Sequence, residues 1–186
     1  TKEFLAGFWI VDCASRERAI AIARRSGRRL KIAAKVDSAD RAYFDDVIAP
    51  MMRGEPLIEF VGEIGDSDKS AFLGGADALL FPIDWPEPFG LVMIEAMACG
   101  TPVVAYRCGS VPEVIEDGLT GFIVENDDQA ADAILKVENL DRKRVRARFE
   151  ERFSSEAMAR RYVALYERLC DGAAVYPSLV DMAASA

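Results

Sequence analysis

The sequence predicts an α/β protein built on a doubly wound parallel β-sheet. Two observations carry this prediction: short apolar, β-branched runs recur along the chain, and segments with helical patterns separate them. The runs are continuous rather than alternating in apolarity, as strands covered on both faces require. At 186 residues the chain fits one domain of ordinary size with a sizeable buried core.

Five runs are expected to form the buried strands of the sheet. Each is rich in Val, Ile, Leu or Phe and is bounded by turn or capping residues. The runs are 30–36, 57–64, 76–83, 101–106 and 121–126. The first 14 residues are apolar enough to form another strand, but they carry few turn signals.

A helix is predicted between the first two of these runs, over residues 38–49. Phe44, Val47 and Ile48 fall on one face of that helix. We expect Pro50 to end it, because proline has no backbone N–H to continue the ladder.

Capping residues predict the starts of the later helices. Each start pairs a short polar side chain with a helical pattern that follows it. The expected caps are Ser67 before a short helix ending at Gly74, Ser110 with Glu113, and Asn126 with Gln129.

A long amphipathic helix is predicted near the end of the chain, with one apolar face. That face consists of Met158, Tyr162, Leu165, Tyr166 and Leu169. We expect one domain over residues 1–170 and a loosely held tail over 171–186.

Composition excludes several classes of site. The chain has no histidine, which excludes a Cys/His zinc site and every Ser-His-Asp or Cys-His catalytic unit. Four cysteines lack any C-x-x-C spacing, so reduced, buried thiols in a cytoplasmic protein are expected. These are Cys13, Cys99, Cys108 and Cys170.

No apolar run approaches the length of a membrane span, and no secretory signal is visible. The first residue is Thr1, so we expect that the natural start is missing or trimmed.

Charge is unevenly distributed along the chain. The net charge is −8, but residues 31–140 alone carry −14 and the flanks 1–30 and 141–168 carry +4 each. An acidic body argues against nucleic-acid binding, which needs a cationic face. The basic run 142–148 is interpreted as the solvated face of a helix.

The segment EPFGLVMIEAMACGTPVVAY, residues 87–106, carries the chemistry. Prolines keep the preceding loop extended, and a helix is expected from Gly90 to about Ala98, ended by Gly100. The loop therefore places a helix N-terminus at the carboxyl edge of the sheet, where doubly wound proteins bind ligands. Free N–H groups there attract anions, and Gly90 allows close approach of a ligand to the backbone.

Two carboxylates bracket this helix N-terminus. Glu87 lies in the loop and Glu95 in the second helical turn. A carboxylate can accept both hydroxyls of a vicinal diol, so two of them around an anion site fit a nucleotide sugar. Glutamates near a helix start are also common as solvated surface residues. However, Glu95 lies within an almost wholly apolar helix, where a carboxylate needs a partner.

Residues 87–106 resemble the Glu-x7-Glu signature of the family 4, or group 1, retaining glycosyltransferases. Three further elements are similar to that family's donor domain in the same order: FVGEI, ADALLFPI and GSVPEVIEDGLTGFIV. The similarity spans about residues 19–169 and leaves 1–18 poorly matched. It implies a Rossmann-like domain that forms the C-terminal, donor-binding half of a two-domain enzyme.

The resemblance also implies roles for individual residues. Glu87 would contact the donor sugar as the candidate catalytic residue, and Glu95 would hold the ribose hydroxyls. Backbone amides of Phe89, Gly90 and Leu91 would lie against the sugar and the diphosphate. The base would lie near three residues after the second predicted run, which are Gly62, Glu63 and Ile64. No metal and no cofactor besides the nucleotide-sugar substrate are implied.

One part of the family pattern is missing. Family members have Gly-Arg and then Lys-Gly near the first strand, and these two cations neutralise the diphosphate. Here Phe8 replaces the arginine, and Cys13 and Ala14 stand where Lys-Gly belongs. Phosphate binding would then rest on the helix N-terminus, with Lys35 or Arg107 as candidate cations. Two arginines close to the missing pair, Arg16 and Arg18, are interpreted as helix-surface charges.

The sequence thus predicts the donor-binding domain of a retaining glycosyltransferase. Its partners would be a nucleotide-sugar donor, an unknown acceptor and an N-terminal acceptor domain absent from this chain. Three alternatives stay open: a non-catalytic nucleotide-sugar binding module, a sugar-nucleotide epimerase of similar architecture, and a scaffold without a ligand. A hydrolase using the paired glutamates is disfavoured, because both lie on one loop-helix unit rather than across a cleft.

Overall fold

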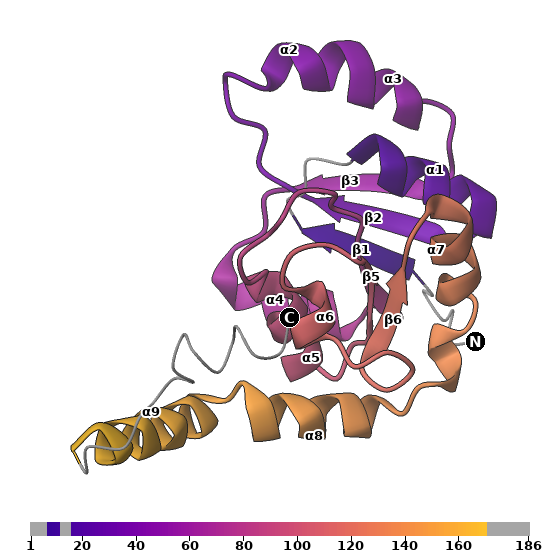
Figure 1. Ribbon diagram of the computed structural model, residues 1–186. Helices are drawn as coiled ribbons and strands as arrows, with labels where there is room; N and C mark the ends of the chain where they lie inside the picture. The colour runs from indigo at the N-terminus through magenta and orange to yellow at the C-terminus, as the bar shows by residue number, and fades with distance from the viewer. Residues whose placement is uncertain (1–6, 12–15, 171–186) are drawn as a thin grey trace, which may run out of the picture. The chain divides into compact units, whose positions relative to one another are not determined.

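The computed structural model describes residues 7–11 and 16–170 of the chain (Figure 1). Within them six strands form one sheet in the order β3-β2-β1-β4-β5-β6, and every neighbouring pair is parallel. The strands are β1 (Gly7–Val11), β2 (Arg29–Ala33), β3 (Ile58–Gly62), β4 (Ala78–Phe81), β5 (Val103–Tyr106) and β6 (Gly121–Val124). This order is the doubly wound topology, and its direction reverses between β1 and β4. The predicted fold class is confirmed.

All five predicted strands are present, each shorter than the apolar run that predicted it. The weakly marked N-terminal segment supplies β1, in the middle of the sheet. Strands β4 and β5 are buried along their whole length, and β2 is buried at Leu30, Ile32 and Ala33. Continuous burial explains why these runs show no polar alternation.

Helices cover both faces of this sheet. Helices α1 (Arg16–Ser26) and α7 (Asp127–Ile134) pack side by side on one face, and α4 (Asp66–Gly74) packs with α5 (Leu91–Ala98) on the other (Figure 1). Short helical segments α6 (Val111–Val114) and a 3₁₀ turn, Val137–Asn139, complete the connections.

The helix predicted to end at Pro50 continues beyond it. It consists of α2 (Arg41–Tyr43), a π-helical turn (Phe44–Ile48) and α3 (Ala49–Met52). Pro50 lies in the first turn of α3, where a missing N–H costs little. The wider π turn changes the phase of the side chains, so Val47 is exposed while Phe44 and Ile48 are buried.

The predicted helix caps have mixed outcomes. Asn126 accepts a hydrogen bond from the N–H of Gln129 (2.9 Å), as predicted for the start of α7. Ser67 does not cap α4; the cap position is Gly65, and the two aspartates of the first turn complement the helix dipole instead. The predicted end of α4 at Gly74 is confirmed.

Helix α8 (Arg142–Arg152) begins with the basic run. Its interpretation as a solvated face is wrong for Arg142, which donates to the carbonyl of Gly74 (2.9 Å) and to the hydroxyl of Thr101 (2.7 Å). Arg146 donates to the carbonyl of Ala98. These carbonyls end α4 and α5, so the arginines satisfy helix C-termini that attract cations.

The chain divides into two compact units, residues 1–148 and 149–186. In the second unit, α9 (Ser155–Cys170) is the amphipathic helix predicted near the end of the chain. Met158, Tyr162, Tyr166 and Leu169 on its apolar face are exposed. The predicted tail over 171–186 lies outside the described residues. The domain assignment to 1–170 stays a prediction.

The described cysteines are free but less buried than expected. Cys99 and Cys108 are half-buried and Cys170 is exposed, while Cys13 lies outside the described residues. Among the helices that the structure describes, none has the length and apolarity needed to cross a bilayer.

Candidate functional site

The loop between β4 and α5 lies at the carboxyl edge of the sheet, as the sequence predicts. Strand β4 ends at Phe81, residues 82–90 form no regular structure, and α5 begins at Leu91 and ends before Gly100. The reversal of strand order lies beside β4, so this loop borders the crevice where doubly wound sheets bind ligands.

Glu87 is half-buried and held by its own loop. One carboxylate oxygen, Oε1, accepts from the N–H of Gly90 (3.2 Å), and Oε2 accepts from the indole N–H of Trp85 (3.2 Å). The Glu87 carbonyl accepts from the N–H of Ser110 (3.0 Å). Each carboxylate oxygen has a second lone pair, so the fixed carboxylate can still accept from a ligand hydroxyl.

The β5–α6 loop fixes this conformation from the other side. Gly109 has a φ of 52°, and a Cβ there would collide with the backbone of Glu87. The Ser110 hydroxyl donates to the carbonyl of Phe89 (2.8 Å). Ser110 is the cap position of α6, as expected, but its side chain makes no capping bond. The cap position of this serine was predicted from the sequence, but its hydrogen bond within the site was not.

The start of α5 presents free backbone donors. Gly90 has a φ of 72°, a backbone conformation that residues with a side chain rarely adopt, and a Cβ there would lie 2.6 Å from the Met93 methyl carbon, so any other residue would be strained. In the described part of the chain, no group accepts from the N–H of Leu91 or Val92. Phe89 and Leu91 are 40% and 64% exposed. Free donors at a helix N-terminus form a site for an anion.

The Glu95 carboxylate is paired with a cation, as expected for a charged group in an apolar helix. Its Oε1 accepts from Lys69 of α4 (3.1 Å), and Lys69 also lies 3.6 Å from Asp66. The hydrogen bond to Glu95 is the first cause that raises the pKa of Lys69. The Glu95 side chain is 37% exposed and borders a cleft of about 320 Å³ between α4 and α5. Its Oε2 has no hydrogen-bond partner among the described residues.

The three residues expected near the base end β3 and lead into α4. Gly62 has a φ of 79°, and its carbonyl accepts from the N–H of Ala34 (3.0 Å). Glu63 is exposed and Ile64 is half-buried. Because α4 follows directly and packs against α5, this loop and Glu95 are brought to the same side of the sheet.

The two candidate phosphate cations are engaged in exposed ion pairs. Lys35 lies 2.8 Å from Asp37, and that hydrogen bond raises the pKa of the lysine. Arg107 lies 2.6 Å from Glu125. Pairs with this exposure contribute little to stability, so either cation can exchange its partner for a ligand at small cost.

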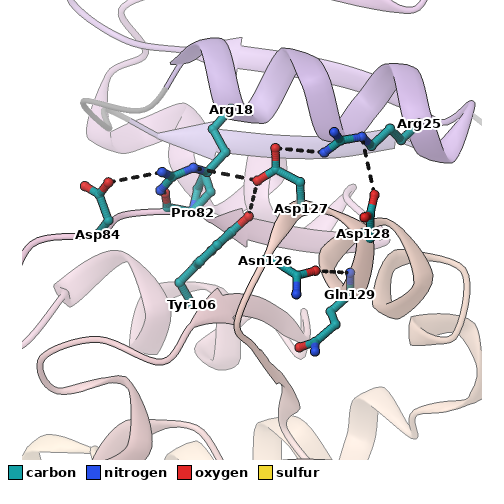
Figure 2. Close-up of polar contacts among 9 residues, drawn as sticks. All are labelled: Arg18, Arg25, Pro82, Asp84, Tyr106, Asn126, Asp127, Asp128 and Gln129. Atoms are coloured by element: carbon teal, nitrogen blue, oxygen red, sulfur yellow. Dashed lines mark hydrogen bonds and ion pairs between the residues drawn. The ribbon is translucent and has the colours of Figure 1, made fainter.

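Arg16 and Arg18 are not simple surface charges. Arg16 is buried. Figure 2 shows the Arg18 guanidinium among residues that follow β4 and the last residue of β5: it donates to the Pro82 carbonyl (3.1 Å) and to Asp84 (3.1 Å), and it lies over the Tyr106 ring (5.0 Å). Arg18 lies in the first turn of α1, where a positive charge is unfavourable next to the helix dipole. This unfavourable position could have indicated from the sequence that Arg18 has specific partners.

No described group of three or more Cys, Asp or Glu side chains is arranged to hold a metal ion. The site in the described residues therefore consists of two carboxylates, free backbone N–H groups and lysine or arginine side chains. This set of groups suits hydroxyls and anions.

Residues 54–153 match the model of the family "Glycosyl transferases group 1". This segment is more than half of the chain and contains Glu87, Glu95 and both loops that hold them. The chain belongs to the group 1 glycosyltransferases. The resemblance stated from the sequence is confirmed, and this glycosyltransferase domain belongs to a family of enzymes.

Curated relatives are glycosyltransferases. N-acetyl-alpha-D-glucosaminyl L-malate synthase of Bacillus anthracis is 38% identical over 111 residues, which is 55% of this chain and 29% of that protein. Phosphatidyl-myo-inositol mannosyltransferase of Mycobacterium leprae is 42% identical over 74 residues, 40% of this chain and 20% of that protein. The chain thus matches less than a third of the length of these relatives.

Solved structures confirm the fold of this group 1 glycosyltransferase domain. AviGT4, a glycosyltransferase involved in avilamycin A biosynthesis, is 29% identical with a TM-score of 0.70, covering 93% of this chain and 53% of its own. HepE of Anabaena, in complex with UDP and glucose, is 20% identical with a TM-score of 0.73 and covers 87% and 48%. The chain spans about half of each.

Proposed function

We propose that this glycosyltransferase domain binds the nucleotide-sugar donor across residues 87–95, for retaining transfer of the sugar to an acceptor. The observation that supports this proposal is the arrangement of groups around the start of α5. Glu87 and Glu95 flank a helix N-terminus whose first N–H groups, at Leu91 and Val92, have no partner in the described chain.

Each part of the site matches one part of such a donor. The diphosphate would lie against the N–H groups of Leu91 and Val92, with Glu87 on the sugar hydroxyls. Glu95, oriented by Lys69 through its Oε1, would present Oε2 to the ribose hydroxyls. The base would lie near residues 62–64, which precede the helix that carries Lys69.

In transfer, the bond between the anomeric carbon and the diphosphate oxygen would break, and a bond to the acceptor oxygen would form on the same face. The acceptor hydroxyl would give its proton to the departing diphosphate oxygen. Negative charge develops on the departing diphosphate. Preorganised backbone N–H groups at the start of α5 would stabilise that charge without reorganisation, which is where such donors contribute most. Glu87, fixed by Gly90 and Trp85, would hold the sugar while one of its faces stays open to an acceptor.

We also propose that the acceptor is bound by residues outside this chain. The relatives are much longer than the matched segment, as the 48% coverage of HepE illustrates. The single crevice at the reversal of strand order would be occupied by the donor.

A ligand-dependent unfolding experiment tests the donor site. HepE, which shares the fold, was crystallised with UDP and glucose, so UDP-glucose is the first probe, followed by GDP- and ADP-sugars. A nucleotide sugar at 100 times its Kd is expected to raise the unfolding free energy by about 2.7 kcal/mol. The matched control is the double variant Glu87→Ala, Glu95→Ala, which should show no rise. Absence of any rise for the unmodified chain with every nucleotide sugar at millimolar concentration contradicts the proposal.

A non-catalytic nucleotide-sugar binding module is the second candidate. The observation that favours it is the sequence near the first strand, where Phe8, Cys13 and Ala14 stand in place of the family's cations. Release of free nucleotide from donor plus acceptor, by the protein that carries this domain, would distinguish a transferase from such a module.

A further inference from the structure

We propose that Arg18 is a positioning residue for the donor sugar: it fixes the β4–α5 loop and thereby the direction of the Glu87 carboxylate. This proposal rests on the proposed function in one respect: it takes the donor sugar to be the ligand of Glu87. Its structural part, that Arg18 determines the order of this loop, stands without that assumption.

Arg18 contacts the loop at its first residues. Its two terminal nitrogens donate separately, Nη1 to the Pro82 carbonyl and Nη2 to the Asp84 carboxylate, both at 3.1 Å. The planar guanidinium therefore holds one backbone and one side-chain group in a fixed relation, which a lysine ammonium cannot do. Pro82 directly follows β4, so the contact is made where the loop leaves the sheet.

The guanidinium is itself held on its other side, as Figure 2 shows. It lies 5.0 Å from the centroid of the Tyr106 ring, which is 8% exposed, and its Nε lies 3.7 Å from Asp127. The Tyr106 hydroxyl donates to the same Asp127 carboxylate, whose other oxygen lies 2.8 Å from Arg25. Arg18 thus has little freedom to turn, although its side chain is 30% exposed.

The path from Arg18 to Glu87 is short. Trp85 follows Asp84 directly, and its indole N–H donates to Glu87 Oε2 at 3.2 Å. The β5–α6 loop holds the far end of the same segment through Gly109 and Ser110. Between these two anchors the loop has no regular secondary structure, so loss of the Arg18 contacts frees the end that carries Trp85.

The first test measures loop order without any ligand. Hydrogen–deuterium exchange of the peptide covering 84–91 is compared among the unmodified chain, Arg18→Met and Arg25→Met. Loss of the charge-assisted contacts is expected to speed exchange of the Glu87 and Gly90 amides about tenfold in Arg18→Met. Arg25→Met is the matched control, because Arg25 pairs with the same Asp127 and with Asp128 but forms no hydrogen bond or ion pair with the described residues of the loop. Unchanged exchange in Arg18→Met overturns the proposal.

A second variant covers the case in which Arg18→Met does not fold. Asp84→Ala removes the loop partner of Arg18 instead, at a side chain that is 66% exposed. It is expected to speed exchange in the same peptide by a smaller factor, because the Pro82 contact remains. If the peptide exchanges at the rate of the unmodified chain, the role of the Arg18–Asp84 contact is refuted.

The second test separates positioning of the sugar from direct phosphate binding. Calorimetric titration is expected to give a Kd for UDP-glucose about tenfold higher in Arg18→Met, with the Kd for UDP changed less than twofold. Arg18→Lys should recover part of the loss, since it can keep one of the two contacts. Equal losses for UDP and UDP-glucose would instead make Arg18 a phosphate ligand and overturn the positioning role. If the unmodified chain binds no nucleotide sugar, the proposed function fails while the exchange experiment still decides the role of Arg18.

Discussion

Glu87 and Glu95 are held by different groups, so under the proposed function their roles can be tested separately. Glu87 is held within its own loop by a backbone N–H and an indole N–H. Glu95 is held from a neighbouring helix by the Lys69 ammonium, an ion pair at 3.1 Å. The sequence predicted both carboxylates from their place around one helix N-terminus. It missed Lys69, because a pair between two helices far apart in sequence leaves no local signal.

Alanine substitution should therefore divide the ligand between the two carboxylates. Glu95→Ala is expected to weaken UDP and UDP-glucose alike, by about tenfold, because the ribose is common to both ligands. Glu87→Ala should weaken only UDP-glucose by a similar factor. Titration calorimetry with both ligands on each variant measures this. Equal loss of UDP binding in both variants would show that the assigned roles are wrong, and no loss in either would make the carboxylates structural.

At the scale of elements, burial made the strands predictable and local packing made the helix ends unpredictable. Residues 103–106, for example, show no polar alternation because β5 is buried along its whole length. The π-helical turn before Pro50 and the Gly65 start of α4 depend on how the helices pack, and no nearby residue specifies them. Arg18 and Ser110 were placed in the correct elements. Their partners, the carbonyls of Pro82 and Phe89, lie 64 and 21 residues away along the chain, so no local pattern indicates them.

At high pH we expect the contact of β5 with α7 to stabilise the fold less, because Tyr106 ionises there. Burial, and then the hydrogen bond to Asp127, raise the pKa of this tyrosine above its ordinary value near 10. A raised folded-state pKa means that the stabilisation is complete below about pH 10 and is lost as the pH rises further. Urea unfolding at pH 9 and pH 11 is expected to show a steeper loss of unfolding free energy in the unmodified chain than in Tyr106→Phe. The difference has an upper limit of about 1.4 kcal/mol per pH unit. Parallel losses in both proteins would refute the tyrosine's part, since the lysines titrate equally in each.

The fold and the family of this domain are shown by the described residues and by the match over 54–153. Sugar transfer, in contrast, also requires a bound acceptor. The doubly wound topology has one reversal of strand order, between β1 and β4, and we assign its crevice to the donor. The chain covers about half of the solved relatives. No histidine is present among the 186 residues to act as a base.

We therefore expect the isolated chain to bind the donor without transferring its sugar. Holding an acceptor in line with the anomeric carbon supplies a large part of the rate enhancement, and a chain without an acceptor site loses that contribution. Water can still reach an uncovered crevice, so slow release of free sugar is the expected residual reaction. The purified chain, incubated with UDP-glucose and a panel of hydroxyl acceptors, is examined by mass spectrometry for glycosylated product and for free glucose. The Glu87→Ala variant is the control for hydrolysis that depends on the site. Multiple turnovers to a glycosylated acceptor would show that these residues contain an acceptor site as well, and that the crevice assigned to the donor serves both reactants.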